Sequence, residues 1–164
     1  MAYWLFKTEP SAFSLDDLRN RPGMTEHWDG VRNYQARNFL RDAVKVDDLV
    51  LFYHSNIPEP AVVGIARVVR AGYPDFTALD PEGDHFDQKA SAQNPIWFMV
   101  DVCYVETLRR PVTLEAIKGN PLLADMPLVK RSRLSIQPVS REEWRIILAM
   151  GGLDTSKAFH ADNF

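Results

Sequence analysis

The sequence predicts an α+β fold, built on a small barrel or strongly bent mixed sheet with helices around it. Several long apolar runs have the composition of strands. Segments with helix caps lie between them, but strands and helices do not alternate one for one. The chain has 164 residues, of which 46% are hydrophobic and 25% are charged, and this fits one domain with an ordinary core.

Five apolar runs predict the strands, and the second and third can pair as a hairpin across a proline-containing turn. The runs are residues 3–6, 48–54, 61–71, 96–106 and 134–139. A long polar segment, Gly72 to Pro95, separates the third run from the fourth. Such loops in compact domains are usually functional or mobile.

Capping residues predict four helices, because a side-chain oxygen at the N-cap accepts from the free N–H groups of the first turn. Ser14 and Ser140 are each followed three residues later by an acid, which is the pattern of a capping box. The expected caps and helices are Ser14 before 15–18, Asn33 before 34–43, Thr113 before 114–118 and Ser140 before 141–150.

Charge and composition exclude several classes of protein. The net charge of −3 argues against indiscriminate wrapping of nucleic acid, although a pocket with a local basic rim is compatible with it. The single cysteine, Cys103, lies in an apolar run and predicts a buried thiol in a reducing, cytoplasmic location. The start, MAYWLFKTEP, lacks the pattern of a secretion signal, and no run approaches the ~18 apolar residues of a membrane span. We therefore expect a soluble protein with no membrane partner.

Trp28 lies in HWDGVRNYQARNFLR, residues 27–41, in a polar segment before a predicted helix. A ring exposed there offers a face on which a nucleic-acid base can stack, worth about 1–3 kcal/mol per base. A ring that fills the gap between two helices would belong to the core instead. Both interpretations are open from these residues alone.

Two short basic clusters suggest an anion-binding groove. Arg32 lies beside Trp28 at a predicted helix start, where unpaired main-chain N–H groups attract anions. Arg37 and Arg41 predict a solvated face. The second cluster is KRSR, residues 130–133, with no acid between Asp125 and Glu142. Alone it is typical of a solvated loop, but together with the first cluster and the loop aromatics it favours a groove that tracks a phosphate backbone.

Catalytic and metal-binding patterns are weak. His54 and Ser55 are adjacent, so in a strand they point to opposite faces. The loop GDHFD, residues 83–87, matches no strong metal signature. We expect no catalytic residue, metal or cofactor. The alternative is an enzyme acting on nucleic acid or a nucleotide, for which His54, Asp84 and His85 are the only plausible residues, and a third possibility is a protein-binding scaffold that uses the same groove.

Six segments, in this order, resemble the EVE domain family: YWLFKTEP, WDGVRNYQARNFLR, DLVLFYHS, PAVVGIARV, NPIWFMVDV and RLSIQPVS. The resemblance covers residues 2–150 and leaves 151–164 as a tail that we expect to be flexible. This family belongs to the PUA-like superfamily, with YTH domains as relatives, and includes thymocyte nuclear proteins of eukaryotes. The resemblance implies a PUA-like β-barrel with peripheral helices and a reader of modified bases in nucleic acid. We therefore expect a non-enzymatic, monomeric protein that binds a modified base in DNA or RNA.

The resemblance also implies roles for particular residues, with a base that is flipped out or comes from a single strand. Trp28 would be a cage aromatic and Trp97 the second wall, although the strand position of Trp97 also fits the barrel core. Further contacts would be Val31 to the base, Asn33 to its edge or a phosphate, His54 and Ser55 at the mouth, Lys7 and Arg32 to phosphate, and Arg131, Ser132 and Arg133 along the rim. YTH cages use two or three aromatics. A single loop tryptophan therefore predicts an incomplete cage, which suits a polar modification such as hydroxymethyl better than a bare methyl.

Overall fold

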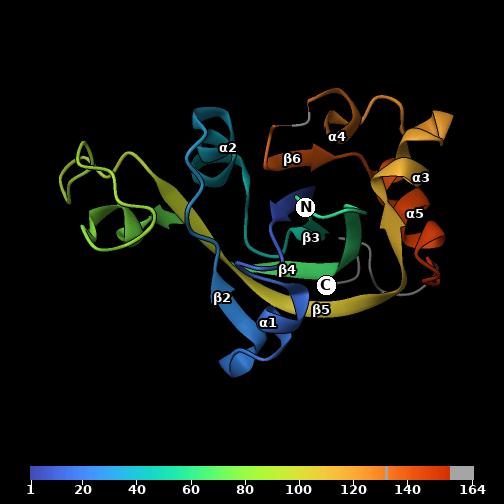
Figure 1. Ribbon diagram of the computed structural model, residues 1–164, viewed down its shortest axis with the longest axis horizontal. Coiled ribbons are helices and arrows are strands. Elements are labelled where there is room, and N and C mark those ends of the chain that lie inside the picture. Colours follow the sequence, from blue (N-terminus) through green and yellow to red (C-terminus); the bar gives the residue numbers. More distant parts are fainter. Residues whose placement is uncertain (132, 156–164) are drawn as a thin grey trace.

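The computed structural model describes residues 1–131 and 133–155. Its centre is a mixed six-stranded sheet with the order β2-β5-β4-β3-β1-β6. The strands are β1 (Tyr3–Thr8), β2 (Thr25–His27), β3 (Leu49–His54), β4 (Ala61–Pro74), β5 (Phe98–Thr113) and β6 (Ile136–Val139). The sheet bends strongly but does not close into a barrel (Figure 1). The predicted α+β class with a bent mixed sheet is confirmed.

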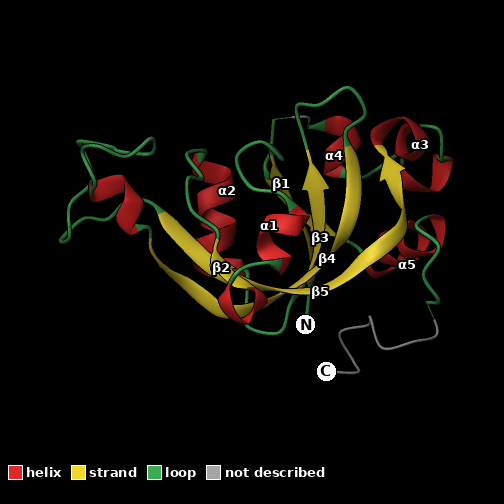
Figure 2. Ribbon diagram, turned by 60° about the horizontal axis from the view of Figure 1, so that its bottom comes forward, coloured by secondary structure: helices red, strands yellow, loops and turns green. Residues whose placement is uncertain are grey.

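The pairing of the strands explains the bend. β1 runs parallel to β3, with Tyr3 opposite Leu49, and antiparallel to β6. β3 and β4 form the predicted antiparallel hairpin. β4 and β5 make a long antiparallel ribbon that curves across the molecule, and its register shifts at several points (Figure 2). Bulges of this kind bend a strand and increase its twist.

Short helices cover the sheet at its edges. They are α1 (Leu15–Arg19), α2 (Tyr34–Asn38), α3 (Leu114–Lys118), α4 (Pro127–Lys130) and α5 (Arg141–Met150). The four predicted helices and their caps are confirmed, and α4 is an addition. Ser14 and Ser140 each form a complete capping box. After α2 the helix widens into a π turn over Phe39–Ala43, so the predicted helix 34–43 has two parts.

The alternation of side chains along β1 builds a core on each face of the sheet. Tyr3 and Leu5 point to the face covered by α5, where Trp144 stacks on Tyr3 with ring centroids 4.7 Å apart. Trp4 and Phe6 point to the opposite face, which α1 and α2 cover. The candidate site is built on this second face.

The strand predicted over 96–106 begins later and runs further than expected, because β5 spans Phe98–Thr113. Ile96 has a positive φ of 59°, which interrupts the extended backbone just before β5. Trp97 therefore lies outside the strand. The short strand β2 was not predicted. Cys103 lies on β5 and is partly exposed, so the prediction of a buried thiol is wrong.

The turn that follows α5, residues 151–153, packs against β5. The N–H of Arg109 donates to the carbonyl of Gly151 at 3.0 Å, and Leu153 packs against the core on the α5 face. The first part of the predicted tail is therefore docked, and residues 156–164 lie outside the described residues. In the part of the chain that the structure describes, no helix has the length and apolar character needed to cross a bilayer.

Candidate functional site

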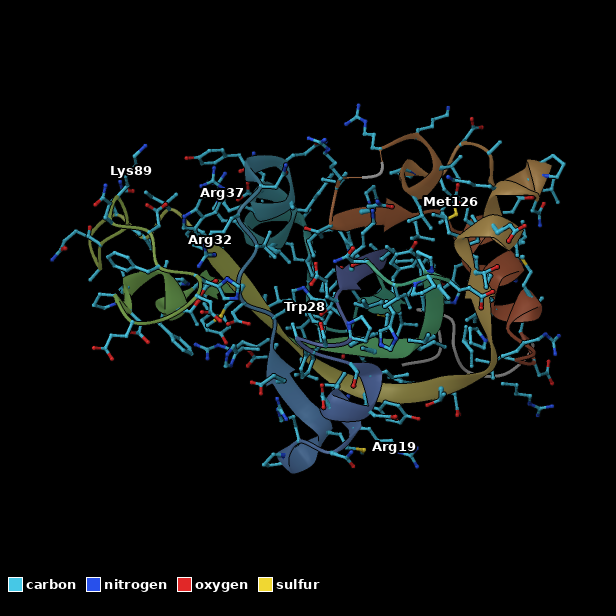
Figure 3. The ribbon with its side chains drawn as sticks, in the orientation of Figure 1. Arg19, Trp28, Arg32, Arg37, Lys89 and Met126 are labelled. Atoms are coloured by element: carbon cyan, nitrogen blue, oxygen red, sulfur yellow. The ribbon has the colours of Figure 1, made fainter. Side chains whose placement is uncertain are left out.

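The sheet face that carries α1 and α2 contains a cavity of about 780 Å³, which we call the Trp28 cavity. Its walls come from the end of β1, the segment just before α1, the end of β2 with its connection to α2, and the tip of the long loop between β4 and β5. The lining residues are 7–9, 12–13, 21, 26–33, 84–85 and 135. Figure 3 shows Trp28 between the segment that follows β2 and the central strands.

Trp28 forms the floor of this cavity and is only 6% exposed. Its ring packs against Phe6 and Phe52, with centroids 5.3 Å away in both cases, and its main-chain N–H donates to the carbonyl of Val100. The interpretation as an exposed loop aromatic is therefore wrong. The ring belongs to the core and also lines the cavity, so the core holds it in a fixed orientation.

Phe13 is a second aromatic residue of the cavity that the sequence analysis missed. Its ring lies 6.0 Å from that of Trp28, edge to face, and the guanidinium of Arg21 lies 5.3 Å from it. Phe13 precedes the N-cap Ser14, and Leu18 follows at the fourth helical position. This is the pattern of a hydrophobic staple, and it fixes the direction in which the chain enters α1. The pattern is visible in the sequence and would have placed Phe13 beside α1.

Trp97 is not part of this cavity. It is 4% exposed, stacks under Tyr34 of α2 at 4.9 Å, and its Nε1 donates to Asp87 at 2.8 Å. Arg37 donates to the carbonyl of Ile96 beside it, so Arg37 is not the solvated residue that was expected. The prediction of Trp97 as a second wall is corrected: this ring attaches the long loop to α2.

Arg32 is engaged by the protein itself. Its guanidinium lies 3.0 Å from Asp75, whose side chain is fully buried, and donates to the carbonyl of His85 at 2.7 Å. Figure 3 shows Arg32 directed toward the long loop. The predicted contact with phosphate is therefore corrected: the guanidinium already has an anionic partner, and it holds the long loop in place.

Asp75 organises this junction. One carboxylate oxygen accepts from Gly30 N–H and Arg32, and the other accepts from the N–H and hydroxyl of Thr77. Burial alone would raise the pKa of Asp75, but the hydrogen bonds from Thr77, Gly30 and Arg32 outweigh it and hold that pKa below its usual range. The carboxylate therefore stays ionised and fixes both sides of the junction.

His85 and Asp84 bring the tip of the long loop to the cavity rim. The His85 ring lies over Gly30, which has a positive φ of 78°, and a Cβ at position 30 would come within 2.6 Å of the ring. The sequence presents Asp84 and His85 as candidates for catalysis and as part of a weak metal-binding pattern. Their place depends on Asp75, which is more than 40 residues from Gly30 in the sequence, and no local pattern could predict it.

His54 lies away from the mouth of the Trp28 cavity. Its Nε2 accepts from the main-chain N–H of Leu15 at 3.2 Å, which ties β3 to the start of α1. Burial lowers the pKa of His54, against smaller opposing effects of Asp16 and Asp17. The predicted position of His54 at the mouth is wrong, because His54 does not line the Trp28 cavity and its acceptor nitrogen is hydrogen-bonded to the main chain of α1. Asp84 and His85, the other two candidates of the enzyme hypothesis, line the Trp28 cavity, so the three residues do not share one site.

Lys7 lies between the Trp28 cavity and a second cavity of about 410 Å³, which contains Ser55. We call this the Ser55 cavity. Its lining residues are Lys7, Thr8, Glu9, Tyr53, Ser55, Asn56, Pro60, Leu114, Leu128, Arg133 and Ser135. The Lys7 ammonium lies 5.8 Å from the centroid of the Tyr53 ring, and burial lowers the pKa of Lys7. Ser55 is therefore near Lys7 but outside the Trp28 cavity.

A third cavity of about 350 Å³, the Arg131 cavity, continues the concave surface on the other side. It is lined by Asn33, Gln35, Lys130, Arg131, Arg133 and Leu134. Asn33 also lines the Trp28 cavity, and Arg133 also lines the Ser55 cavity. The structure thus brings Lys7, Arg131 and Arg133 to one continuous surface, while Ser132 lies outside the described residues.

Asn33 and Val31 are both on the wall of the Trp28 cavity. Asn33 is the N-cap of α2, as predicted, and its Oδ1 accepts from the N–H of Ala36 at 3.0 Å. Val31 is 6% exposed and belongs to the core beneath the cavity. Both lie in the connection from β2 to α2, which supplies most of one wall.

This arrangement is suited to a flat, partly polar ligand with an anionic group beside it. An aromatic floor can pack against a planar ring, charged walls can bond to its polar edges, and the basic residues of the neighbouring cavities can pair with an anion. Among residues 1–131 and 133–155, no cluster of three His, Cys, Asp or Glu side chains is placed to hold a metal ion.

Comparison with known proteins agrees with this fold and extends the resemblance seen in the sequence. Residues 2–150 match the EVE domain. Thymocyte nuclear protein 1 of Mus musculus is 42% identical over 166 residues, which covers 90% of this chain and 73% of that protein. The structure of a hypothetical protein from Leishmania major is 49% identical, with a TM-score of 0.88 over 93% of this chain and 95% of that one.

A further solved structure is that of the human THYN1 protein in complex with DNA containing 5-methylcytosine. It is 40% identical, with a TM-score of 0.88 over 94% of this chain and 99% of that one. The six segments read from the sequence thus correspond to a family match along nearly the whole chain. This chain belongs to the EVE domain family, and its fold is PUA-like.

Proposed function

We propose that this chain is a non-enzymatic reader of a modified base in nucleic acid, and that the Trp28 cavity holds the base. One observation carries the proposal. A cavity with an aromatic floor is present in a domain 40% identical to a human protein that was crystallised with DNA containing 5-methylcytosine. A base that leaves its stack has two flat apolar faces and a polar edge. Trp28 and Phe13 pack against the ring, and the polar walls meet the edge.

The basic residues around the cavity hold the strand on either side of the base. Lys7 stands at the boundary with the Ser55 cavity, and Arg131 and Arg133 line the Arg131 cavity. Contacts of this kind position the phosphate backbone and carry no sequence information. They also confine the binding surface to one face, which suits a chain whose net charge is −3.

The composition of the walls favours a modification that is itself polar. Phe13 and Trp28 are the apolar aromatic residues that line the Trp28 cavity, and His27 and His85 add two imidazoles. Seven lining residues have Asp, Glu, Lys or Arg side chains: Lys7, Glu9, Arg21, Glu26, Asp29, Arg32 and Asp84. An aromatic cage built for a methyl group encloses it on several sides, and this cavity does not. A hydroxymethyl group finds hydrogen-bond partners here that a methyl group cannot use.

The test is a binding series with dye-labelled oligonucleotides, followed by fluorescence anisotropy. Single strands and duplexes of DNA and RNA carry cytosine, 5-methylcytosine or 5-hydroxymethylcytosine at one position, in low and in physiological salt. We expect one modified base to bind at least ~10-fold more tightly than cytosine, a difference of ~1.4 kcal/mol. Equal, weak affinities that vanish with salt would contradict the proposal, because they indicate attraction to phosphate alone.

The same mixtures separate a reader from an enzyme. After incubation, mass spectrometry of the oligonucleotides reports any change in the base or the strand. A reader returns every oligonucleotide unchanged. A change in mass that requires the protein would support the alternative of an enzyme, and substitution of Asp84 or His85 would then show whether the cavity carries the reaction.

A further inference from the structure

Asp29 follows Trp28 directly and lines the Trp28 cavity in a half-buried position. Three other carboxylates line the same cavity. Glu26 is paired with Arg21 at 2.9 Å and with His27 at 2.8 Å, Glu9 accepts from Asn56, and Asp84 is exposed at the rim. Within the described ranges 1–131 and 133–155, the Asp29 carboxylate has no hydrogen-bond or ion-pair partner. In the described part of the chain Asp84 also has no such partner but is exposed to solvent, so Asp29 is the half-buried acid of the cavity that the protein leaves for a ligand.

Main-chain donors accompany this acceptor. The N–H of Gly30 donates to Asp75, but the N–H groups of Val31 and Asn33 donate to no acceptor in the described part of the chain. Both residues lie in the segment that lines the cavity. Val31 is buried, and a buried N–H is normally hydrogen-bonded, whereas Asn33 is exposed at the cavity wall and its N–H is open to a ligand or to solvent. This wall therefore offers one acceptor, the Asp29 carboxylate, and two donors, the N–H groups of Val31 and Asn33. A complementary ligand needs a hydrogen-bond donor next to hydrogen-bond acceptors.

From this arrangement, and resting on the proposed function, we propose that Asp29 selects a base with an exocyclic amino group next to a ring nitrogen. Cytosine presents this edge, with its N4 amino group as donor and N3 and O2 as acceptors, and adenine presents the same pair in N6 and N1. The carboxylate accepts from the amino group, and the main-chain N–H groups donate to the ring acceptors. Asp29 thus chooses the base, and the rest of the cavity reads the modification.

Thymine tests the inference well, because it carries the methyl group of 5-methylcytosine but has an oxygen in place of the amino group. In the cavity that oxygen would face the Asp29 carboxylate, so two acceptors would oppose each other and both would stay unpaired. A site built to hydrogen-bond one group discriminates strongly against an analogue that lacks it.

The experiment compares matched bases at one position of a single-stranded DNA oligonucleotide, by anisotropy. The pairs are 5-methylcytosine against thymine, and adenine against hypoxanthine. We expect the wild-type protein to favour the amino member by at least tenfold. The pair with the larger ratio identifies whether the ligand is a pyrimidine or a purine. In Asp29→Asn the side chain can donate to the oxo group, so the preference falls at least tenfold or reverses.

Asp42→Asn is the matched control, because it removes the same charge from an exposed carboxylate outside the cavity and should keep the wild-type preference. A ligand-side measurement needs no variant: an oligonucleotide with 5-methyl-2-pyrimidinone, which lacks the amino group, should bind the wild type at least tenfold more weakly than 5-methylcytosine. The inference is overturned if the wild type binds modified cytosine selectively but accepts thymine equally, or if Asp29→Asn keeps the full preference. If the wild type distinguishes no base at all, the proposed function itself fails.

Discussion

The imidazole of His85 covers Gly30 so closely that a Cβ at position 30 would come within 2.6 Å of its Nε2 atom. Gly30 also has a positive φ of 78°. Through this contact, the segment between β2 and α2 packs against the tip of the long loop. Both segments line the Trp28 cavity. The shape of the rim therefore depends on a residue without a side chain.

Gly30→Ala should destabilise the protein by about 1–3 kcal/mol, because alanine is strained at this φ and its Cβ meets the His85 ring. The measurement is the free energy of unfolding in urea, in the wild type and in a His85→Ala background. Removal of the ring relieves the collision but not the backbone strain, so the cost of Gly30→Ala should be smaller in that background. Equal costs in the two backgrounds would show that the ring does not restrict position 30.

Asp75→Asn should cost about 2–3 kcal/mol of unfolding free energy, because it removes a buried anion that serves Gly30, Arg32 and Thr77. This loss of unfolding free energy is at the low end for breaking a buried ion pair, because the Arg32 side chain is 24% exposed to solvent. The folded pKa of Asp75 is lowered, so its contribution is complete above the unfolded pKa of about 3.9 and is lost as the pH falls through the folded value.

Denaturation of this variant at pH 7 and near pH 3 measures both effects. The difference between wild type and Asp75→Asn should shrink at the lower pH. Asp125→Asn is the control, because Asp125 pairs with Lys130 on the surface with its side chain 90% exposed, and such pairs add little. A variant at Asp75 that is as stable as Asp125→Asn would contradict the role of Asp75 as the organiser of the junction.

His54 gives a pH dependence near neutrality. Its Nε2 accepts from Leu15, which requires the neutral ring, and burial lowers its pKa. The stabilising effect is therefore complete above the unfolded pKa of about 6.5 and is lost as the pH falls through the lower folded value, with a slope of at most ~1.4 kcal/mol per pH unit. We expect His54→Gln, which can still accept through its amide oxygen, to flatten the unfolding free energy between pH 7.5 and 5.5. His85→Gln, at an exposed position, should retain the wild-type slope.

The parts of the fold that sequence could predict are those fixed by local chemistry. Ser14, Asn33, Thr113 and Ser140 cap their helices as expected, since a cap and its first turn are neighbours in the chain. The start of β5 was missed because a positive φ at Ile96 ends the extended run, and an apolar sequence does not reveal it. The predicted closure of the sheet into a barrel was also wrong, because β2 and β6 remain as edge strands at the two ends of the sheet. Which strands pair at the edges depends on residues far apart in the sequence, and a local pattern does not show it.

The candidate site was predictable to a smaller extent. The sequence indicated Trp28, Val31 and Asn33 correctly as neighbours, because they belong to one continuous segment. The sequence did not indicate the positions of Trp97 and Arg32. Trp97 contacts Tyr34 and Asp87, and Arg32 pairs with Asp75. Asp75 and Asp87 belong to the long loop between β4 and β5, and the path of that loop is set by tertiary packing.

Lys7 should contribute to affinity without reading the base. Lys7→Met removes one cation at the boundary of the Trp28 and Ser55 cavities, so modified and unmodified oligonucleotides should lose affinity alike. The slope of log K against log salt should also become shallower by about 1. Lys45→Met is the control, because Lys45 is exposed before the start of β3 and its ammonium donates to the carbonyl of Asp42. A loss confined to the modified oligonucleotide would instead place Lys7 at the base.

Trp28 can be tested without loss of the fold. Trp28→Ala would leave a large void in the core, so Trp28→Phe is the better change. Trp144→Phe is its matched control: Trp144 is also buried, but it stacks on Tyr3 on the opposite face of the sheet. Both variants should lose stability on the order of 1–2 kcal/mol from the smaller ring.

Only Trp28→Phe should change the ratio of affinities for modified and unmodified cytosine, because only its ring lines the cavity. Anisotropy titrations of both variants, at a temperature where urea denaturation shows them folded, separate stability from recognition. If the two variants change the ratio equally, the effect comes from a loosened core, and the base must bind elsewhere. If Trp28→Phe alone reduces the ratio at least tenfold, the floor of the cavity takes part in reading the modification.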